Sequence, residues 1–225
     1  MAGLFIVGTG PGIATSVARR FGATGMPVGL LSRTTASLDA AQRALRAAGV
    51  ERVATSAADA GSELGLRSGL DRLLDSLGVP EVVVYNAGLI RFDRPGELDH
   101  AGHQAAYAVN VLGALTTAAH LAPRMAAAGG GTIIVTGGMP QPLPTVVSLS
   151  LGKAGVRALT TMLAAEYGPA GVHVATVTVC DAVVPGTDYD PDAIAEHYWR
   201  LHRQAPDQWE HEVTFRGAST FAGQA

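Results

Sequence analysis

Short apolar runs rich in valine, leucine and isoleucine alternate with longer, alanine-rich segments from one end of the chain to the other. Strands that read as continuous apolar runs are typical of parallel sheets, because helices cover both of their faces. The alternation therefore predicts an α/β fold: a doubly wound, Rossmann-like parallel sheet of about seven strands with helices on both faces. No repeat, linker or shift in composition interrupts it, so we expect a single domain over residues 1–225.

The positions of the elements follow from the same pattern. Strands are expected at Leu4–Val7, Val28–Leu31, Val53–Ser56, Val82–Tyr85, Thr132–Thr136, His173–Val179 and Glu212–Phe215. Helices are expected at Ile13–Ala23, Ala36–Ala48, Leu66–Leu77, Gly102–Ala127, Ser150–Tyr167 and Pro191–His202. Ligands of such sheets bind in the crevice beyond the carboxyl ends of the strands, so the residues that follow each strand are the candidates for a site.

Composition and charge exclude several classes of function. The formal net charge of −3 and the pI near 6.1, with arginines scattered among acids, leave no basic stripe for a nucleic acid. A single cysteine, Cys180, allows no internal disulfide and favours a reducing, cytoplasmic compartment. The first residues lack the basic region of a signal peptide, and we expect no membrane helix, which requires roughly 18 consecutive apolar residues.

A glycine-rich turn follows the first expected strand and opens the first expected helix. Glycines at such a turn let phosphates approach the backbone, and the helix N-terminus attracts their charge. The turn therefore predicts a site for the pyrophosphate of a dinucleotide. Its candidate residues are Gly8, Thr9, Gly10, Gly12 and Ile13.

The second expected strand ends at Ser32 and Arg33, where a carboxylate would accept the ribose hydroxyls of NAD. A guanidinium at this position instead matches a 2′-phosphate, and the Ser32 hydroxyl adds a donor. NADP is therefore predicted in preference to NAD.

Lys153 is the only lysine in a chain whose lysines and arginines number 16 together. An ammonium is a compact charge that a guanidinium does not replace, so a solitary lysine within an expected helix indicates a specific role. The glycine turn, the Asn86-Ala87-Gly88 sequence and Asn110 support that interpretation, because each follows or faces an expected strand end.

These motifs together resemble those of the short-chain dehydrogenase/reductase family, and the likeness covers essentially the whole chain. The resemblance implies that Asp59 contacts the adenine and that the Asn86 motif supports the adenine side of the cofactor. It also implies that Asn110 holds a water beside the catalytic lysine, and that Lys153 clasps the nicotinamide ribose. The other cofactor contacts that it implies are Ala87, Gly88, Thr136 and Val183.

The chain departs from the family pattern where the family keeps its proton donor. Leu149 stands four residues before Lys153, where the family has tyrosine, and Gly138 stands where a serine is expected. Cys180-Asp181 replaces the family's Pro-Gly after the sixth strand. Loss of a general acid and of an oxyanion donor together costs about 6–9 kcal/mol against an ordinary ketone.

The sequence therefore predicts an atypical NADPH-dependent oxidoreductase that transfers hydride to an activated electrophile, namely an enone, an imine or a quinone. A relay of Lys153, Asn110 and water is the expected proton source. Asp181, Cys180 and Ser150 are alternative sources of a polar group.

Two other functions stay open at this point. One is an NADP-binding regulatory or partner module without hydride transfer, and the other is a non-redox cyclase or lyase that uses an apolar pocket near Leu149 and Met139. We expect no metal, because His100 and His103 have no further ligand cluster nearby. A small-molecule substrate is expected, and the helices Gly102–Ala127 and Ser150–Tyr167 resemble those through which family members form homodimers or homotetramers.

Overall fold

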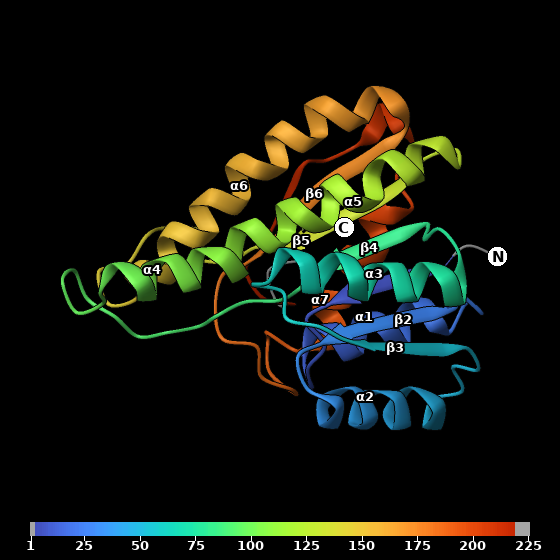
Figure 1. Ribbon diagram of the computed structural model, residues 1–225, viewed down its shortest axis with the longest axis horizontal. Coiled ribbons are helices and arrows are strands. Elements are labelled where there is room, and N and C mark those ends of the chain that lie inside the picture. The colour runs from blue at the N-terminus through green and yellow to red at the C-terminus, as the bar shows by residue number, and fades with distance from the viewer. Residues whose placement is uncertain (1–2, 219–225) are drawn as a thin grey trace.

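The predicted α/β fold is confirmed by the structure, a computed structural model that describes residues 3–218. Seven strands form one parallel sheet in the order β3-β2-β1-β4-β5-β6-β7, so the chain winds outward in both directions from β1 (Figure 1). The strands are β1 Leu4–Val7, β2 Val28–Ser32, β3 Val53–Ala57, β4 Val82–Tyr85, β5 Gly131–Thr136, β6 Val172–Val179 and β7 Glu212–Phe215. The order reverses between β1 and β4, and a ligand crevice forms at such a switch point.

Among residues 3–218, seven α-helices connect the strands. They are α1 Ile13–Gly22, α2 Thr35–Ala47, α3 Glu63–Leu77, α4 His100–Tyr107, α5 Gly113–Ala127, α6 Val147–Tyr167 and α7 Pro191–His202. Short turns of helix lie at Ala108–Leu112 (η1), Gly168–Ala170 (η2) and Pro206–Gln208 (η3). The side chains of Thr34, Ser62, Asp99 and Asp190 cap α2, α3, α4 and α7 by accepting hydrogen bonds from first-turn amides.

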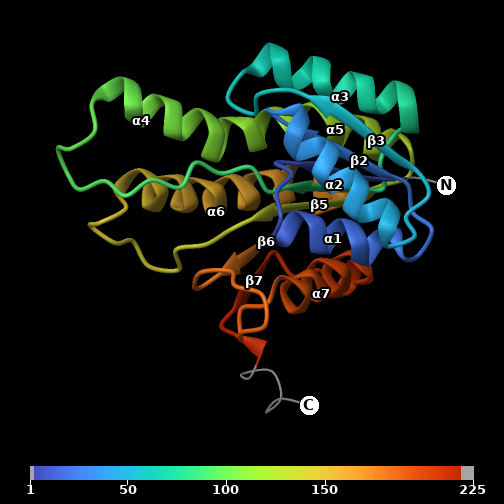
Figure 2. The same ribbon diagram turned by 90° about the horizontal axis from the view of Figure 1, so that it is seen from below.

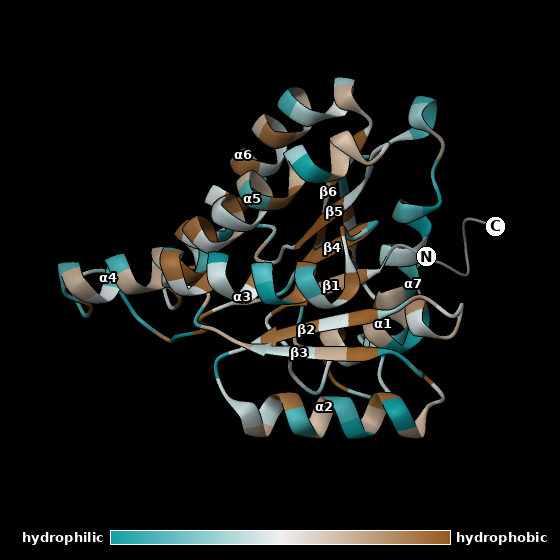
Figure 3. Ribbon diagram, turned by 45° about the vertical axis from the view of Figure 1, so that its right-hand side comes forward, coloured by the Kyte–Doolittle hydropathy of each residue, from teal (hydrophilic) through white to brown (hydrophobic). Residues whose placement is uncertain are grey.

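The helices cover the sheet in two layers. α1, α2 and α7 pack on one face, where Phe21, Tyr198 and Phe215 are fully buried, and α3, α5 and α6 pack on the other. Hydrophobic colour concentrates on the central strands, while polar residues line the outer sides of the helices (Figure 3). In Figures 1 and 2, α4 and the first turns of α6 extend beyond the carboxyl edge of the sheet, the edge at which the predicted site residues gather.

The helix predicted over Gly102–Ala127 is present and begins two residues earlier, at His100, but a π-turn at η1 lies within it, between α4 and α5. The Tyr85 hydroxyl donates a hydrogen bond to the Val109 carbonyl in this turn, a bond that regular helix geometry does not provide. Gly113 is the first residue of α5, and a Cβ on it would lie only 2.1 Å from the Tyr85 hydroxyl oxygen, so this position requires glycine. The end of β4 therefore sets the position of the π-turn, and turns of this kind often occur at functional sites.

Helix α6 begins at Val147, one turn earlier than predicted. Its first amides are held by a residue distant in sequence, the buried Asp93, whose carboxylate accepts hydrogen bonds from the Ser148 amide at 3.0 Å and from the Ser148 hydroxyl at 2.7 Å. The Val147 amide also donates to the Asp93 carbonyl. An acidic group at a helix N-terminus is favourable, and here it fixes the loop after β4 against α6.

One segment has the length and composition of a bilayer-crossing helix. The 28 residues His100–Ala127 reach a mean hydropathy of 1.3 over their most apolar window, but 56% of that window is buried within the protein. The π-turn also interrupts the segment. Core helices of globular domains have the same composition, and more than half of this window is buried as theirs are.

Candidate active site

The glycine turn after β1 has two kinds of glycine. Gly8 has a φ of +93°, and a Cβ there would lie 2.2 Å from the Ala87 nitrogen, so the packing of β1 against β4 requires glycine. A Cβ on Gly10 or Gly12 would meet nothing within 4 Å. Gly12 precedes α1, which has no side-chain cap, so the first-turn amides are open to an external acceptor. The turn thus fits a pyrophosphate.

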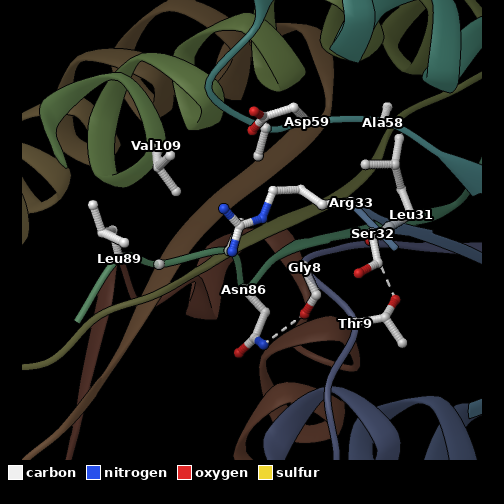
Figure 4. A pocket seen from close by; sticks show the side chains of 13 residues that line it. Gly8, Thr9, Leu31, Ser32, Arg33, Ala58, Asp59, Asn86, Leu89 and Val109 are labelled. Carbon is white, nitrogen blue, oxygen red and sulfur yellow. Dashed lines mark hydrogen bonds between the residues drawn. The ribbon is translucent and has the colours of Figure 1, made fainter. Parts of the chain in front are cut away.

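A cavity of about 250 Å³ opens between the ends of β1, β2, β3 and β4 (Figure 4). The Arg33 side chain extends across it, with Asp59 on one side and Asn86 and Leu89 on the other. Asp59 uses its carboxylate to accept a hydrogen bond from the Gly61 amide at 2.9 Å. The cavity brings together eight of the predicted site residues: Gly8, Thr9, Ser32, Arg33, Asp59, Asn86, Ala87 and Gly88.

The remaining candidates lie outside the lining of this cavity. Gly10, Gly12 and Ile13 belong to the adjoining turn and the start of α1. Val183 packs on the core that faces α1 and α7, and no contact tests its predicted cofactor role. Asn110, Thr136 and Lys153 lie on η1, β5 and α6.

A chain of hydrogen bonds, buried at Tyr198 and partly buried at Asn86, joins the ends of the central strands to α7. The Asn86 Nδ2 donates to the Gly8 carbonyl at 2.9 Å, and its Oδ1 accepts from the Thr136 hydroxyl at 3.0 Å. The Thr136 proton is thereby used, so the Tyr198 hydroxyl, 2.8 Å away, donates to Thr136. Burial raises the pKa of Tyr198, which keeps the phenol protonated. The Thr136 hydroxyl thus supports the strand ends and has no proton free for a ligand.

The Lys153 side chain extends from α6 to the carboxyl end of β5. Its Nζ donates to the Thr136 carbonyl at 2.7 Å, and the side chain is only partly exposed. Burial lowers the pKa of Lys153 from 10.5 to about 8. The ammonium is therefore mostly charged at neutral pH but gives up its proton more readily than a surface lysine.

Asn110 is 2% exposed, and its side-chain amide is fixed by the backbone. Its Oδ1 accepts from the Leu89 amide at 2.7 Å, and its Nδ2 donates to the Leu89 carbonyl at 3.2 Å. On α6, a Cβ on Gly152 would lie 2.8 Å from the Asn110 Cβ, so glycine there lets the helix approach the π-turn. Asn110 thus positions the loop after β4, and its predicted role in holding a water stays a prediction.

Neither position at which the family has a catalytic hydroxyl has one in this chain. Leu149 is buried one helical turn before Lys153, and a Cβ on Gly138 would lie 3.7 Å from the Lys153 Cε. Within residues 3–218, no tyrosine hydroxyl is hydrogen-bonded to Lys153: Tyr107 lies on α4 with 44% of its surface exposed, and Tyr189 packs edge-on against Phe215.

The alternative polar groups are engaged elsewhere. The Ser150 hydroxyl bonds to the backbone of Leu143 in the loop before α6. Asp181 is exposed and accepts from the Ala182 amide, and burial raises the pKa of the Cys180 thiol, which makes it a weaker acid. No group of three or more metal-ligating side chains gathers within the described residues.

Three residues that sequence reasoning missed complete the site. Tyr198 supports Thr136, Asp93 caps α6, and Arg157 donates to the carbonyls of Gly138 and Met139 at 3.1 and 3.2 Å. Each partner lies 18 or more residues away along the chain. No local motif marks such pairs; the one available signal was that Arg157 lies one turn after Lys153 on the same helix face.

Comparison with known proteins identifies the family to which this arrangement belongs. The family model described as short chain dehydrogenase matches residues 3–190. The chain belongs to the short-chain dehydrogenase family. The members of this family are oxidoreductases that use a nicotinamide cofactor, which agrees with the cavity at the ends of β1 and β2.

Individual short-chain dehydrogenases are similar at moderate identity. Galactitol 2-dehydrogenase (L-tagatose-forming) of Cereibacter sphaeroides is 29% identical, over 80% of this chain and 69% of its own. Cis-4-hydroxycyclohexanecarboxylate dehydrogenase of Sinomonas cyclohexanicum is 30% identical, over 80% and 71%. The crystal structure of a metagenomic short-chain oxidoreductase in complex with NADP has a TM-score of 0.84 at 29% identity, and the match covers 95% of this chain and 96% of that one.

The chain of hydrogen bonds from Tyr198 to Gly8 makes a prediction about stability. Thr136→Val removes the hydroxyl and leaves the Tyr198 phenol and the Asn86 oxygen without their partner, which is expected to cost about 1–3 kcal/mol of unfolding free energy. Thr160→Val is the matched control, since the buried Thr160 hydroxyl bonds only to its own helix, at Val156. Urea unfolding measures both; equal losses in the two variants would contradict the proposed support.

The lowered pKa of Lys153 predicts a pH-dependent stability. Between the folded pKa of about 8 and the ordinary 10.5, the unfolded chain holds a proton that the folded chain has lost, so stability rises with pH across this window. The gain is about 1–3 kcal/mol after allowance for screening. Unfolding free energies of the wild type minus those of Lys153→Met should grow from pH 8 to pH 10; a flat or falling difference would exclude this burial effect.

Proposed function

We propose that this short-chain dehydrogenase is an atypical NADPH-dependent oxidoreductase that acts on an activated electrophile: an enone, an imine or a quinone. The supporting observation is the pairing of Lys153, partly buried with a lowered pKa, with Leu149 one turn before it on α6. A lysine maintained at this position favours chemistry, whereas a leucine opposite the reacting carbonyl gives no acid assistance.

The preference for NADP over NAD rests on Arg33. The phosphate of NADP would lie at the mouth of the cavity, where the Arg33 guanidinium and the Ser32 hydroxyl are donors and Asp59 is the nearest acid. Asp59 lies on the far side of Arg33 from Asn86 and Leu89. A bidentate guanidinium suits a phosphate, and a carboxylate that would instead favour ribose hydroxyls is absent at the end of β2.

When bound, the reduced nicotinamide supplies a hydride to the electrophile. The amides of the turn at Gly10 and Gly12 would hold the pyrophosphate, and Lys153 would hold the nicotinamide ribose. The Tyr198–Thr136–Asn86 chain keeps these elements in register. Lys153, with water at the π-turn beside Asn110, is the proposed donor of the proton that completes the reduction.

Oligomeric state and surroundings are part of the same proposal. Exposed apolar side chains on η1, α5 and α6, at Leu112, Leu115, Leu151 and Met162, support pairing of copies through these helices into a homodimer or homotetramer. We propose a cytoplasmic enzyme with a small-molecule substrate and without nucleic-acid or membrane partners.

The role of Arg33 is tested by exchanging its charge. Arg33→Asp is expected to weaken NADPH binding by roughly 10- to 100-fold, through loss of charge-assisted hydrogen bonds, while NADH binding is unchanged or improved. Nucleotide fluorescence measures the dissociation constants. Arg46→Asp, an exposed charge on α2 outside the cavity, is the control; equal weakening of NADPH and NADH in Arg33→Asp would reject the 2′-phosphate contact.

Turnover tests the reaction itself. Purified protein is mixed with NADPH and a panel of enones, imines, quinones and simple ketones, and oxidation is followed by absorbance. We expect turnover with activated acceptors, loss of about 10²-fold or more in Lys153→Ala, and new ketone activity in Leu149→Tyr, because that substitution supplies a phenol acid.

NADPH binding without turnover of any acceptor would reject the redox proposal. The protein would then be an NADP-binding regulatory module or a non-redox enzyme, functions that the hydrocarbon at Leu149 and the missing side chain at Gly138 also permit.

A further inference from the structure

The loop after β5 contains backbone donors that the protein itself leaves unpaired. Among residues 3–218, the amides of Gly138 and Met139 have no hydrogen-bond acceptor, although Gly138 is buried and Met139 is partly buried. Buried backbone N–H groups are nearly always paired, because an unmade hydrogen bond is costly. Two consecutive unpaired donors beside Lys153 indicate an acceptor that comes from outside the chain.

Hydrogen bonds from a neighbouring helix hold this loop in its conformation. Met139 has a φ of +49°, the only positive φ of a non-glycine residue among the described residues. Residues in such strained conformations persist where their surroundings enforce them, and they cluster at active sites. Here the enforcing group is Arg157, whose guanidinium donates to the carbonyls of both Gly138 and Met139.

The direction of one donor follows from peptide geometry. In a trans peptide the C=O and the following N–H point in opposite directions. Because Arg157 holds the Gly138 carbonyl, the Met139 N–H points away from Arg157. The same segment passes Lys153, whose Cε is 3.7 Å from the position of a Cβ on Gly138. The Gly138–Met139 segment thus passes beside Lys153 at the position where the family's serine is expected.

We propose that the Gly138 and Met139 amides bind the substrate oxygen on which negative charge develops, and that Arg157 is the positioning residue for them. This inference rests on the proposed function and narrows its substrate class. Two N–H donors complement an oxyanion, whereas a protonated imine nitrogen is itself a donor. The substrate is therefore a conjugated carbonyl compound, an enone or a quinone, and not an imine.

The reaction balances with NADPH as the reductant. The hydride forms a C–H bond at the carbon conjugated to the carbonyl, the C=C electrons shift, and the charge arrives on the oxygen that faces the two amides. A proton from solvent, passed through Lys153, then completes the two-electron reduction and leaves NADP⁺. Removal of one such donor lowers kcat by roughly 10²-fold in comparable sites.

A binding experiment tests the amides without requiring turnover. The probe is 4-nitrophenol, added to the protein saturated with NADP⁺, and the absorbance of the phenolate reports its affinity and its degree of ionisation. We expect the wild type to bind the phenolate and to lower the phenol pKa. Replacement of Met139 by its α-hydroxy acid, which exchanges the N–H for an ester oxygen, should weaken phenolate binding about tenfold or more.

Four further variants separate the contribution of the backbone from that of the side chains. The hydroxy-acid analogue of Gln141, an exposed residue of the same loop, is the control for the ester. Met139→Gly keeps the N–H and should keep the probe bound within about threefold. Arg157→Met removes the single nitrogen, Nη1, that donates to both carbonyls and should weaken the probe, whereas Arg46→Met should not.

The results separate this inference from the function on which it rests. Phenolate binding that is absent in the wild type, unchanged by the Met139 ester, or lost equally in Met139→Gly would overturn the amide site, even if enones are reduced. Phenolate binding that depends on the Met139 amide, with no NADPH oxidation by any acceptor, would support the site and reject the redox function. Turnover of imines at rates equal to enones would overturn the narrowed substrate class.

Discussion

The hydrogen bond from the Thr136 hydroxyl to the Asn86 Oδ1 is the junction on which the rest of the site depends. It joins the ends of β4 and β5, and the same asparagine continues through its Nδ2 to the Gly8 carbonyl at the end of β1. Backbone bonds such as that from the Asn86 amide to the Val7 carbonyl end just past the strands, and these side-chain bonds add further links between the loops that leave the sheet. The same set of hydrogen bonds thus links the glycine turn to Lys153.

Helix α6 uses two cations, one turn apart, on the loop that this junction anchors. Lys153 holds the Thr136 carbonyl, and Arg157 holds the next two available carbonyls, at Gly138 and Met139. Burial disfavours the charge of Lys153, whereas Arg157 uses its guanidinium to hold two carbonyls of the loop. One side chain is therefore suited to exchange a proton and the other to hold geometry.

The sequence predicted the features that depend on hydrophobic periodicity or on the spacing of residues near one another in the chain. Strand positions, the glycine turn and the cavity residues from Gly8 to Gly88 follow from apolar runs and from residues placed directly after strands. The sequence did not reveal what a distant partner decides: Asp93 starts α6 early, and Tyr85 bonds to the π-turn that lies within the helix predicted over Gly102–Ala127. The sequence also did not predict that the Thr136 hydroxyl is hydrogen-bonded to Tyr198, because Tyr198 lies 62 residues away.

The two missing hydroxyls and the two unpaired amides concern the same site, beside Lys153. A serine at position 138 and a tyrosine at position 149 would supply two neutral donors to a carbonyl oxygen. With glycine and leucine in their places neither hydroxyl is present, and the Gly138 and Met139 amides are the donors proposed to face the oxygen. Donors of this kind stabilise an oxyanion but have no proton to transfer at neutral pH. A substrate that can delocalise its charge before protonation is thus matched to the site, and a simple ketone is not.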